Sequence, residues 1–177
     1  SCTMKYNPKF CETVAQLHGF SDLHPLIPQL KNGEQFVQGA LEVLYELERW
    51  MCEMTGMDKF TMQPLAGAHG ELTGVMMMEA YHKSKGNKKK YIVIPDSAHG
   101  KNPATASIAG YEIISIPSTP EGVMDIEILK SKINDEVAGL MMTCPDTYGL
   151  FNSDIDKIAK MIHAVDGIMY YDGANLN

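Results

Sequence analysis

The chain has 177 residues, of which 45% are apolar and 21% are charged, a composition typical of one globular domain with a sizeable core. The formal net charge of -7 argues against a nucleic-acid-binding surface, and no apolar run reaches the length of a membrane span. The four cysteines are scattered without CxxC spacing, which indicates a reducing compartment rather than a disulfide framework or a zinc site. Basic residues at positions 83–90 are interpreted as a solvated loop.

The first third of the chain predicts an irregular arm followed by helices. Residues 1–34 contain three prolines and several turn formers, so we expect an arm with little regular structure. Apolar residues then recur at helical spacing over residues 35–55, and Gly56 follows as a stop signal. A second helix is predicted over residues 70–84. The expected organisation is therefore an N-terminal arm and one domain over residues 35–177.

From residue 91 onward, short apolar strands alternate with helical segments. Strands are predicted, in chain order, at residues 91–94, 112–116, 137–143 and 167–172, and helices at 103–109, 125–133 and 153–165. Asp125 is expected to cap its helix, and Ser153 with Asp156 resembles a capping box. This alternation predicts an α/β fold with a three-layer αβα arrangement, in which a mainly parallel sheet is covered on both faces.

Several polar side chains follow the predicted strands or open a helix. In a parallel sheet the loops 95–102, 143–152 and 172–177 gather along one edge, where open α/β sheets bind ligands. Asp172 closes the last strand, and a carboxylate there is costly unless a cation or a hydrogen-bond donor meets it. Its plainer role is to cap a following helix. His99, at an earlier strand end, is equally consistent with an ordinary loop histidine.

The predicted 70–84 helix is entered through Gly-Ala-His-Gly at residues 67–70. Gly67 and Gly70 allow close approach of the backbone to a ligand, and the free N–H groups and helix dipole favour a phosphate there. A plain turn is an equally simple interpretation, because glycine at a helix start is common. His69 either points inward or packs, and Glu71 is favourable in a first helical turn whatever the function.

Together these residues fit a pyridoxal-phosphate site. The helix entry would hold the phosphate, and Asp172 would keep the pyridine nitrogen protonated, which makes the ring an electron sink. His99 would lie over one face of the ring and Ala174 would pack against the other. Thr143 or Thr147 would hydrogen-bond the ring substituents.

Four longer motifs carry a family resemblance that covers essentially the whole chain. They are Ser-Cys-Thr-Met-Lys-Tyr-Asn-Pro at residues 1–8, Gln-Pro-Leu-Ala-Gly-Ala-His-Gly-Glu at 63–71, Pro-Asp-Ser-Ala-His-Gly at 95–100 and Tyr-Tyr-Asp-Gly-Ala-Asn-Leu-Asn at 170–177. The chain resembles the pyridoxal-phosphate-dependent glycine decarboxylases, the P-protein family of the glycine cleavage system. Within that family it is most similar to the C-terminal half-type subunit, subunit 2.

The resemblance implies the large domain of a type I, aspartate-aminotransferase-like enzyme that binds pyridoxal 5'-phosphate. It implies decarboxylation of glycine with transfer of the aminomethyl group to the lipoyl group of the H-protein. The implied partners are P-protein subunit 1 and the lipoylated H-protein, in an oligomer located in the cytoplasm, or in mitochondria for a eukaryotic parent. The implied catalytic residues are His99 and Asp172, with no metal ligand. The implied cofactor-binding residues are Gly67, Ala68, His69, His99, Thr143, Thr147, Asp172 and Ala174.

Two departures from the family pattern bear on activity. The family's Schiff-base lysine follows the Asp-Gly-Ala-Asn motif and lies beyond Asn177, so we expect this chain to be a truncated fragment that is inactive alone. Lys130, Lys132, Lys157 and Lys160 are interpreted as helix-surface residues. The family loop Thr-Asn-Pro-Asn-Thr reads Thr-Cys-Pro-Asp-Thr at residues 143–147.

Three alternatives remain open at the level of sequence. Another type I pyridoxal enzyme, an aminotransferase or a cysteine desulfurase, would use Asp172 and His99 in the same way. A metal-dependent hydrolase would use as ligands His69, Glu71, Asp96, His99 and Asp172, although no compact HExxH-like spacing supports it. The third alternative is a scaffold or interaction domain without catalysis.

Overall fold

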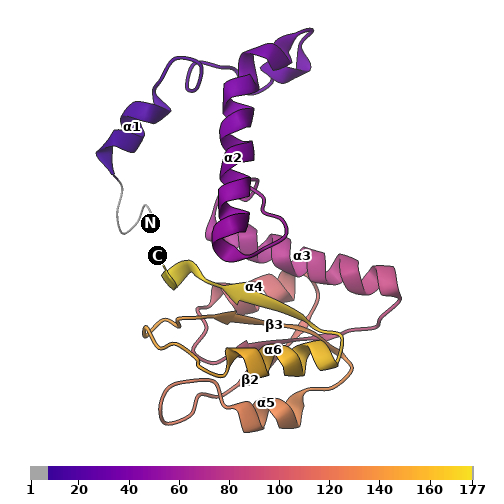
Figure 1. The fold of residues 1–177 in the computed structure, drawn as a ribbon. Helices are drawn as coiled ribbons and strands as arrows, with labels where there is room; N and C mark the ends of the chain where they lie inside the picture. The colour runs from indigo at the N-terminus through magenta and orange to yellow at the C-terminus, as the bar shows by residue number, and fades with distance from the viewer. Residues whose placement is uncertain (1–7, 177) are drawn as a thin grey trace. The chain divides into compact units, whose positions relative to one another are not determined.

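The computed structural model describes residues 8–176 except the side chain of Lys101 (Figure 1). The motif at residues 1–7 and the final Asn177 therefore lie outside the described residues. The chain divides by its internal contacts into two compact units, Ser1–Pro64 and Leu65–Asn177. The expected division into an arm, residues 1–34, and one larger domain stays a prediction.

The first unit is built from helices. It contains α1 (Lys9–Ala15), two 3-10 turns (Ile27–Gln29 and Gly33–Val37) and α2 (Gln38–Thr55). The helix predicted over 35–55 is confirmed from Gln38 onward, whereas residues 35–37 belong to the preceding 3-10 turn. It ends at Gly56, whose φ of 72° is the left-handed conformation that glycine adopts at little cost. Helix α1 was not expected. It forms in a stretch that lacks proline, directly after Pro8.

The second unit contains the predicted parallel sheet. Its strands are β1 (Tyr91–Pro95), β2 (Glu112–Ile116), β3 (Val137–Thr143) and β4 (Ile168–Asp172). They lie in the order β2-β1-β3-β4, and every neighbouring pair is parallel. All strands therefore end at the same edge of the sheet, as the alternating pattern predicts.

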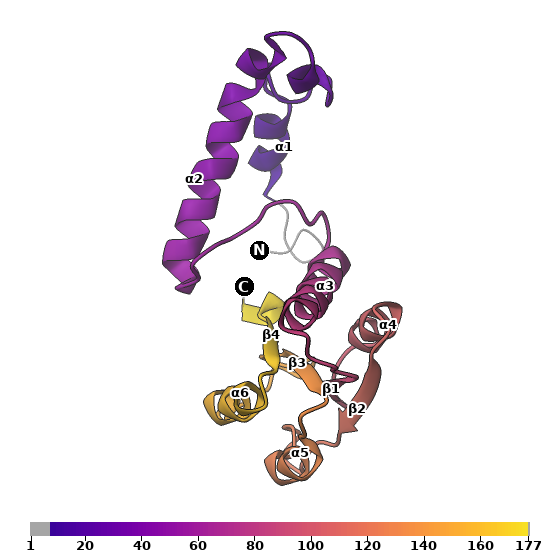
Figure 2. The same ribbon diagram turned by 90° about the vertical axis from the view of Figure 1, so that its right-hand side faces the viewer.

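Four helices cover the two faces of this sheet. Helices α3 (Gly67–Lys85) and α4 (Lys101–Ile108) lie on one face, and α5 (Ile126–Lys132) and α6 (Ile155–Ala164) lie on the other (Figure 2). This is the three-layer αβα arrangement expected from the sequence. Among the described residues, no helix is both long and apolar enough to span a membrane.

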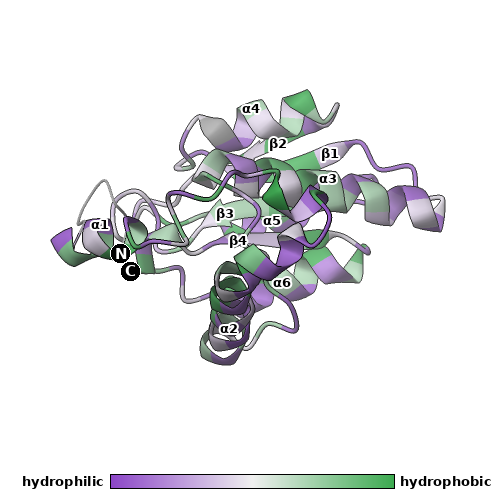
Figure 3. Cartoon of the chain, turned by 90° about the horizontal axis from the view of Figure 1, so that it is seen from above, coloured by the Kyte–Doolittle hydropathy of each residue, from purple (hydrophilic) through white to green (hydrophobic). Residues whose placement is uncertain are grey.

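Each face of the sheet has its own apolar core. On the α5–α6 face, residues such as Val93, Leu140 and Ile162 are fully buried. On the α3–α4 face, Val75 and Met141 are buried in the same way. Every residue of β3 is buried, which explains its continuous apolar sequence, drawn in green to white in Figure 3.

The two predictions of side-chain caps at helix starts have different outcomes. Asp125 caps α5 as predicted, because its carboxylate accepts the backbone N–H groups of Glu127 and Ile128. The predicted capping box at Ser153 is wrong. The cap position of α6 is Asp154, which makes no side-chain cap bond, and the Asn152 side chain accepts the Asp154 N–H instead.

Candidate functional site

The candidate site lies at the edge where the parallel strands end. Two side chains, those of Thr147 and Asn175, connect the segments that follow three of these strands. Thr147 donates from Oγ1 to the Ser97 carbonyl at 3.4 Å, which links the loop after β3 to the loop after β1. The Asn175 amide donates to the carbonyl oxygens of Pro145 at 3.0 Å and Asp146 at 3.1 Å. The three loops predicted to gather along one edge are therefore joined by hydrogen bonds.

Asp172 is the last residue of β4 and is held from two sides. Its partner in the sheet register is Thr143, the last residue of β3, and the Thr143 hydroxyl lies 3.3 Å from Oδ2 of Asp172. Oδ1 accepts the backbone N–H of Ala174 at 3.1 Å. The side chain is only 14% exposed. These donors stabilise the carboxylate in a partly buried position and fix its direction.

His99 and Glu71 converge on this carboxylate. Nε2 of His99 lies 3.5 Å from Oδ2 of Asp172 and 3.2 Å from Oε1 of Glu71. The Glu71 side chain is 5% exposed, whereas that of His99 is 36% exposed. Three elements distant in sequence, α3, the loop after β1 and the end of β4, therefore bring one imidazole between two carboxylates.

The glycine-rich entry of α3 is exposed to solvent. Helix α3 begins at Gly67, three residues earlier than predicted, and its cap residue Ala66 offers no side-chain cap bond. Gly67, Ala68 and His69 are exposed. The first N–H groups of a helix have no intrahelical acceptor, so this entry has the donors that an anion needs.

Tyr170 is a residue at the site that the sequence reasoning did not select. Its ring packs against Gly74 of α3, and its hydroxyl lies 3.8 Å from the position of a Cβ added at Gly70. Burial raises the pKa of Tyr170 to about 12, and the charges of Asp172 and Glu71 add to the effect. Its alternation with Asp172 along β4 is the signal that places both side chains on the α3 face.

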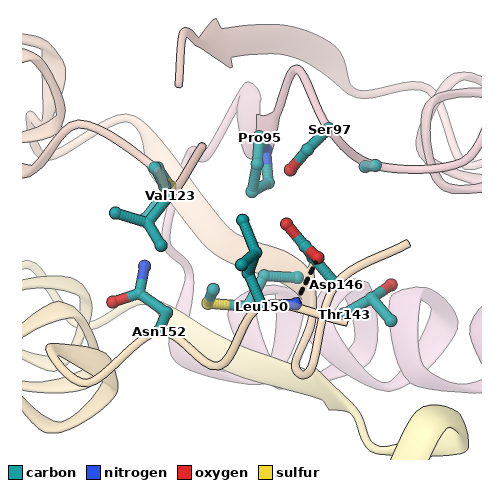
Figure 4. A pocket seen from close by; sticks show the side chains of 10 residues that line it. Pro95, Ser97, Val123, Thr143, Asp146, Leu150 and Asn152 are labelled. Carbon is teal, nitrogen blue, oxygen red and sulfur yellow. Dashed lines mark hydrogen bonds between the residues drawn. The ribbon is translucent and has the colours of Figure 1, made fainter. Parts of the chain in front are cut away.

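Other predicted residues lie apart from this convergence. The Asp96 carboxylate accepts the Ser118 hydroxyl and backbone N–H, and these hydrogen bonds lower the pKa of Asp96. A separate hollow at the same edge is lined by residues that include Pro95, Ser97, Asp146 and Asn152. Figure 4 shows the backbone N–H of Leu150, another lining residue, bonded to the Asp146 carboxylate. Its lining contains Thr143 but neither His99 nor Asp172.

The three converging side chains also form a set that can hold a metal ion. Glu71, His99 and Asp172 each offer one ligand atom, and these atoms lie within 4.8 Å of one another. His69 and Asp96, the other metal ligands considered from the sequence, are not in this set.

The chain is similar in structure to solved pyridoxal-phosphate enzymes, among them the two below. No protein-family model matches the chain. An inhibitor-bound glycine decarboxylase (P-protein) of the glycine cleavage system matches 93% of this chain and 35% of its own length, with a TM-score of 0.72 and 16% identity. A sphingosine-1-phosphate lyase from Burkholderia pseudomallei matches 61% of this chain and 25% of its own length, with a TM-score of 0.55 and 18% identity. The second unit thus has the fold of the large domain of type I pyridoxal-phosphate enzymes.

Sequence relatives narrow this class to one family. The chain is 57% identical over its whole length to a probable glycine dehydrogenase (decarboxylating) subunit 2 from Caldanaerobacter subterraneus subsp. tengcongensis. It is 51% identical to the protein of the same name from Pyrococcus horikoshii. The chain belongs to the glycine dehydrogenase (decarboxylating) subunit 2 family. It covers 36% and 34% of these two relatives, so it spans about a third of their length.

Proposed function

We propose that the chain forms part of the pyridoxal-phosphate-binding domain of a glycine decarboxylase of the glycine cleavage system. The observation that carries the proposal is the 57% identity over the whole chain to a probable glycine dehydrogenase (decarboxylating) subunit 2. The complete protein would decarboxylate glycine and transfer the aminomethyl group to the lipoyl group of the H-protein. Its partners would be P-protein subunit 1 and the H-protein. Cytoplasmic location is part of the proposal and is supported by bacterial and archaeal relatives.

The donor set at the strand edge fits the cofactor. The backbone N–H groups of the exposed residues Gly67 and Ala68, together with the side chain of His69, would bind its phosphate. The partly buried carboxylate of Asp172 suits a protonated ring nitrogen, since it is already oriented by Thr143 and Ala174.

His99, Thr147 and Ala174 complete the proposed binding set. His99 lies beside Asp172, and its side chain is 36% exposed, which leaves it accessible to a ring. Thr147 is exposed on a loop of the same edge, although its hydroxyl is bonded to Ser97. Ala174 is exposed at the start of the 3-10 helix Ala174–Leu176. When bound, pyridoxal phosphate supplies an electron sink for the carbanion left by loss of carbon dioxide. The chain would hold the proton on the ring nitrogen through Asp172.

The test uses a full-length protein that contains this chain and matches its relatives in length. It is mixed with subunit 1 and lipoylated H-protein. Labelled bicarbonate should exchange with the carboxyl group of glycine, and added pyridoxal phosphate should produce a visible absorption band. A well-folded, cofactor-loaded protein that exchanges no label would contradict the proposed reaction.

Asp172→Asn provides the sharpest test of a single residue. An amide cannot stabilise a proton on the ring nitrogen as a carboxylate does, so we expect exchange to fall by at least about 100-fold while the cofactor still binds. Asp156→Asn, an exposed acid of α6, is the matched control and should leave exchange unchanged. Wild-type exchange in the Asp172 variant would remove this residue from the role of ring partner.

The metal-capable set supports one competing function, a metal-dependent hydrolase. It rests on Glu71, His99 and Asp172, whose ligand atoms lie within 4.8 Å of one another. Elemental analysis of the purified protein, set against the visible absorption after addition of pyridoxal phosphate, separates the two functions. Stoichiometric metal without cofactor binding would favour the hydrolase.

A further inference from the structure

We propose that Glu71 is a positioning residue that holds the imidazole of His99 at the cofactor site. The proposal deepens the proposed function and rests on it for the role that His99 then performs. The sequence predicts that Glu71 lies in the first turn of a helix, where a carboxylate is favourable. That prediction is wrong, because α3 begins at Gly67 and its first turn holds no acidic residue. The contacts of its carboxylate assign it a more specific role.

The burial of Glu71 is the first observation. Its side chain is 5% exposed, and a buried carboxylate is costly unless donors or cations meet it. Oε1 lies 3.2 Å from Nε2 of His99, an ion-pair distance for a protonated imidazole. Because an ionised carboxylate only accepts, a hydrogen bond between these two atoms needs the hydrogen on Nε2.

The second observation concerns the His99 ring itself. His99 lies in the loop between β1 and α4, so its backbone is not held in a sheet or helix. Within the described part of the chain, its Nδ1 is buried and has no hydrogen-bond partner. The orientation of the ring therefore depends on the contacts of Nε2 with Glu71 and Asp172.

The two carboxylates are not equivalent. One N–H cannot donate fully to both, and Asp172 lies farther away, at 3.5 Å, and already accepts bonds from Thr143 and Ala174. Under the proposed function the Asp172 carboxylate meets the ring nitrogen of the cofactor. Glu71, carried by the 19-residue helix α3, then remains as the acceptor that fixes His99. The charge of Glu71 also reaches the site, because it contributes to the raised pKa of Tyr170.

The test compares two substitutions in the full-length protein with its partner subunit. Glu71→Gln keeps an acceptor oxygen at the same reach, whereas Glu71→Met has a similar volume and no such acceptor. Glu79→Gln is the matched control, because Glu79 lies on the same helix and pairs with Lys83. The readouts are the His99 Nε2 proton resonance in histidine-labelled protein, identified by its loss in His99→Gln, the affinity for pyridoxal phosphate, and kcat and KM for glycine.

We expect Glu71→Met to lose the hydrogen-bonded Nε2 resonance and to lower kcat by about 100-fold, with KM changed less than threefold. Glu71→Gln should retain the resonance and most of the kcat, and Glu79→Gln should match wild type. An unchanged resonance and kcat in Glu71→Met would overturn the proposal. So would a Gln variant as inactive as the Met variant with the resonance intact, since charge and not position would then matter.

Two further outcomes are decisive in the same way. If Glu71→Met does not fold, Glu71→Asp replaces it, because the shorter side chain withdraws the acceptor; retention of the resonance and of kcat there would overturn the proposal. If wild type neither binds pyridoxal phosphate nor exchanges label, the proposed function fails. The Nε2 resonance still decides whether Glu71 holds His99.

Discussion

Asp166 shows how one residue can make stability depend on pH. It follows α6 with a φ of 55°, a left-handed conformation that Asp tolerates better than most residues. Its carboxylate accepts the Tyr81 hydroxyl at 2.7 Å, the Asn87 amide at 2.8 Å and the Lys85 ammonium at 3.2 Å. These bonds, led by that of Tyr81, lower the pKa of Asp166 to about 2.

A pH-dependent loss of stability is expected from this lowered pKa. The unfolded chain takes up the proton near pH 4 and the folded chain only near pH 2, so the stabilisation is complete above about pH 4 and is lost as the pH falls toward 2. Urea unfolding at a series of pH values measures it. Tyr81→Phe should make the free energy of unfolding depend less steeply on pH between 4 and 2, and Asp166→Asn should remove the contribution of this residue. A slope unaffected by either change would contradict the assignment.

The basic residues around position 85 are largely neutralised in the structure. Lys83 pairs with Glu79, Lys85 with Asp166, and Lys90 with Glu136. Lys89 donates to the Val165 carbonyl. The interpretation of residues 83–90 as a loop holds only for residues 86–90, because residues 83–85 form the last turn of α3.

The contact between α3 and β4 shows how two elements are fitted together. A Cβ added at Gly74 would lie 2.5 Å from Cδ2 and 2.6 Å from Cε2 of Tyr170, closer than real contacts allow. Glycine therefore lets the helix approach the strand that carries Asp172. The Tyr170 ring of β4 fills the space that a side chain at position 74 of α3 would take.

Gly74→Ala should destabilise the protein in spite of the better helix propensity of alanine. Propensity favours alanine by about 1 kcal/mol, but displacing the Tyr170 ring costs roughly 1–3 kcal/mol. We expect a net loss of about 1 kcal/mol in urea unfolding, together with weaker cofactor binding. Gly39→Ala in α2 is the control, because a Cβ there meets nothing within 4 Å, and it should be neutral or slightly stabilising. A stabilised Gly74 variant would show that the ring moves without cost.

The strands, helix ends and caps could be predicted from the sequence because they depend on residues that are near one another in the chain. The strand patterns, Gly56 as a helix end and Asp125 as a cap are all of this kind, and the structure confirms them. The capping box at Ser153 failed because α6 begins at Ile155, so its cap position is Asp154 and not Ser153. The Asn152 side chain accepts the Asp154 N–H just ahead of the helix.

At the scale of the whole molecule, the two units differ in their ability to bury apolar surface. Among residues 8–64 the only buried residue is Gly33. The unit Leu65–Asn177 contains both apolar cores and the whole sheet. Burial of apolar side chains is the main favourable term in folding, so stability should reside in the second unit.

Residues 65–177 produced alone should therefore fold, with one cooperative thermal transition followed by near-UV circular dichroism. Residues 1–64 alone should show no such transition, because Gly33 is the only buried residue in the described range 8–64. The intact chain provides the reference. A molten or aggregated 65–177 segment, with native-like unfolding only in the intact chain, would show that the first unit is needed for folding.

The sequence by itself determined the parallel αβα architecture, the edge that carries the polar loops and the candidates His99 and Asp172. These follow from periodicities of two and 3.6 residues and from motifs, which are properties of short segments. Only the tertiary structure decided that Glu71 and His99 meet Asp172, and that Tyr170 packs on Gly74. Those contacts depend on the register of β3 with β4 and on how α3 docks, and long-range packing of this kind leaves no trace in local sequence.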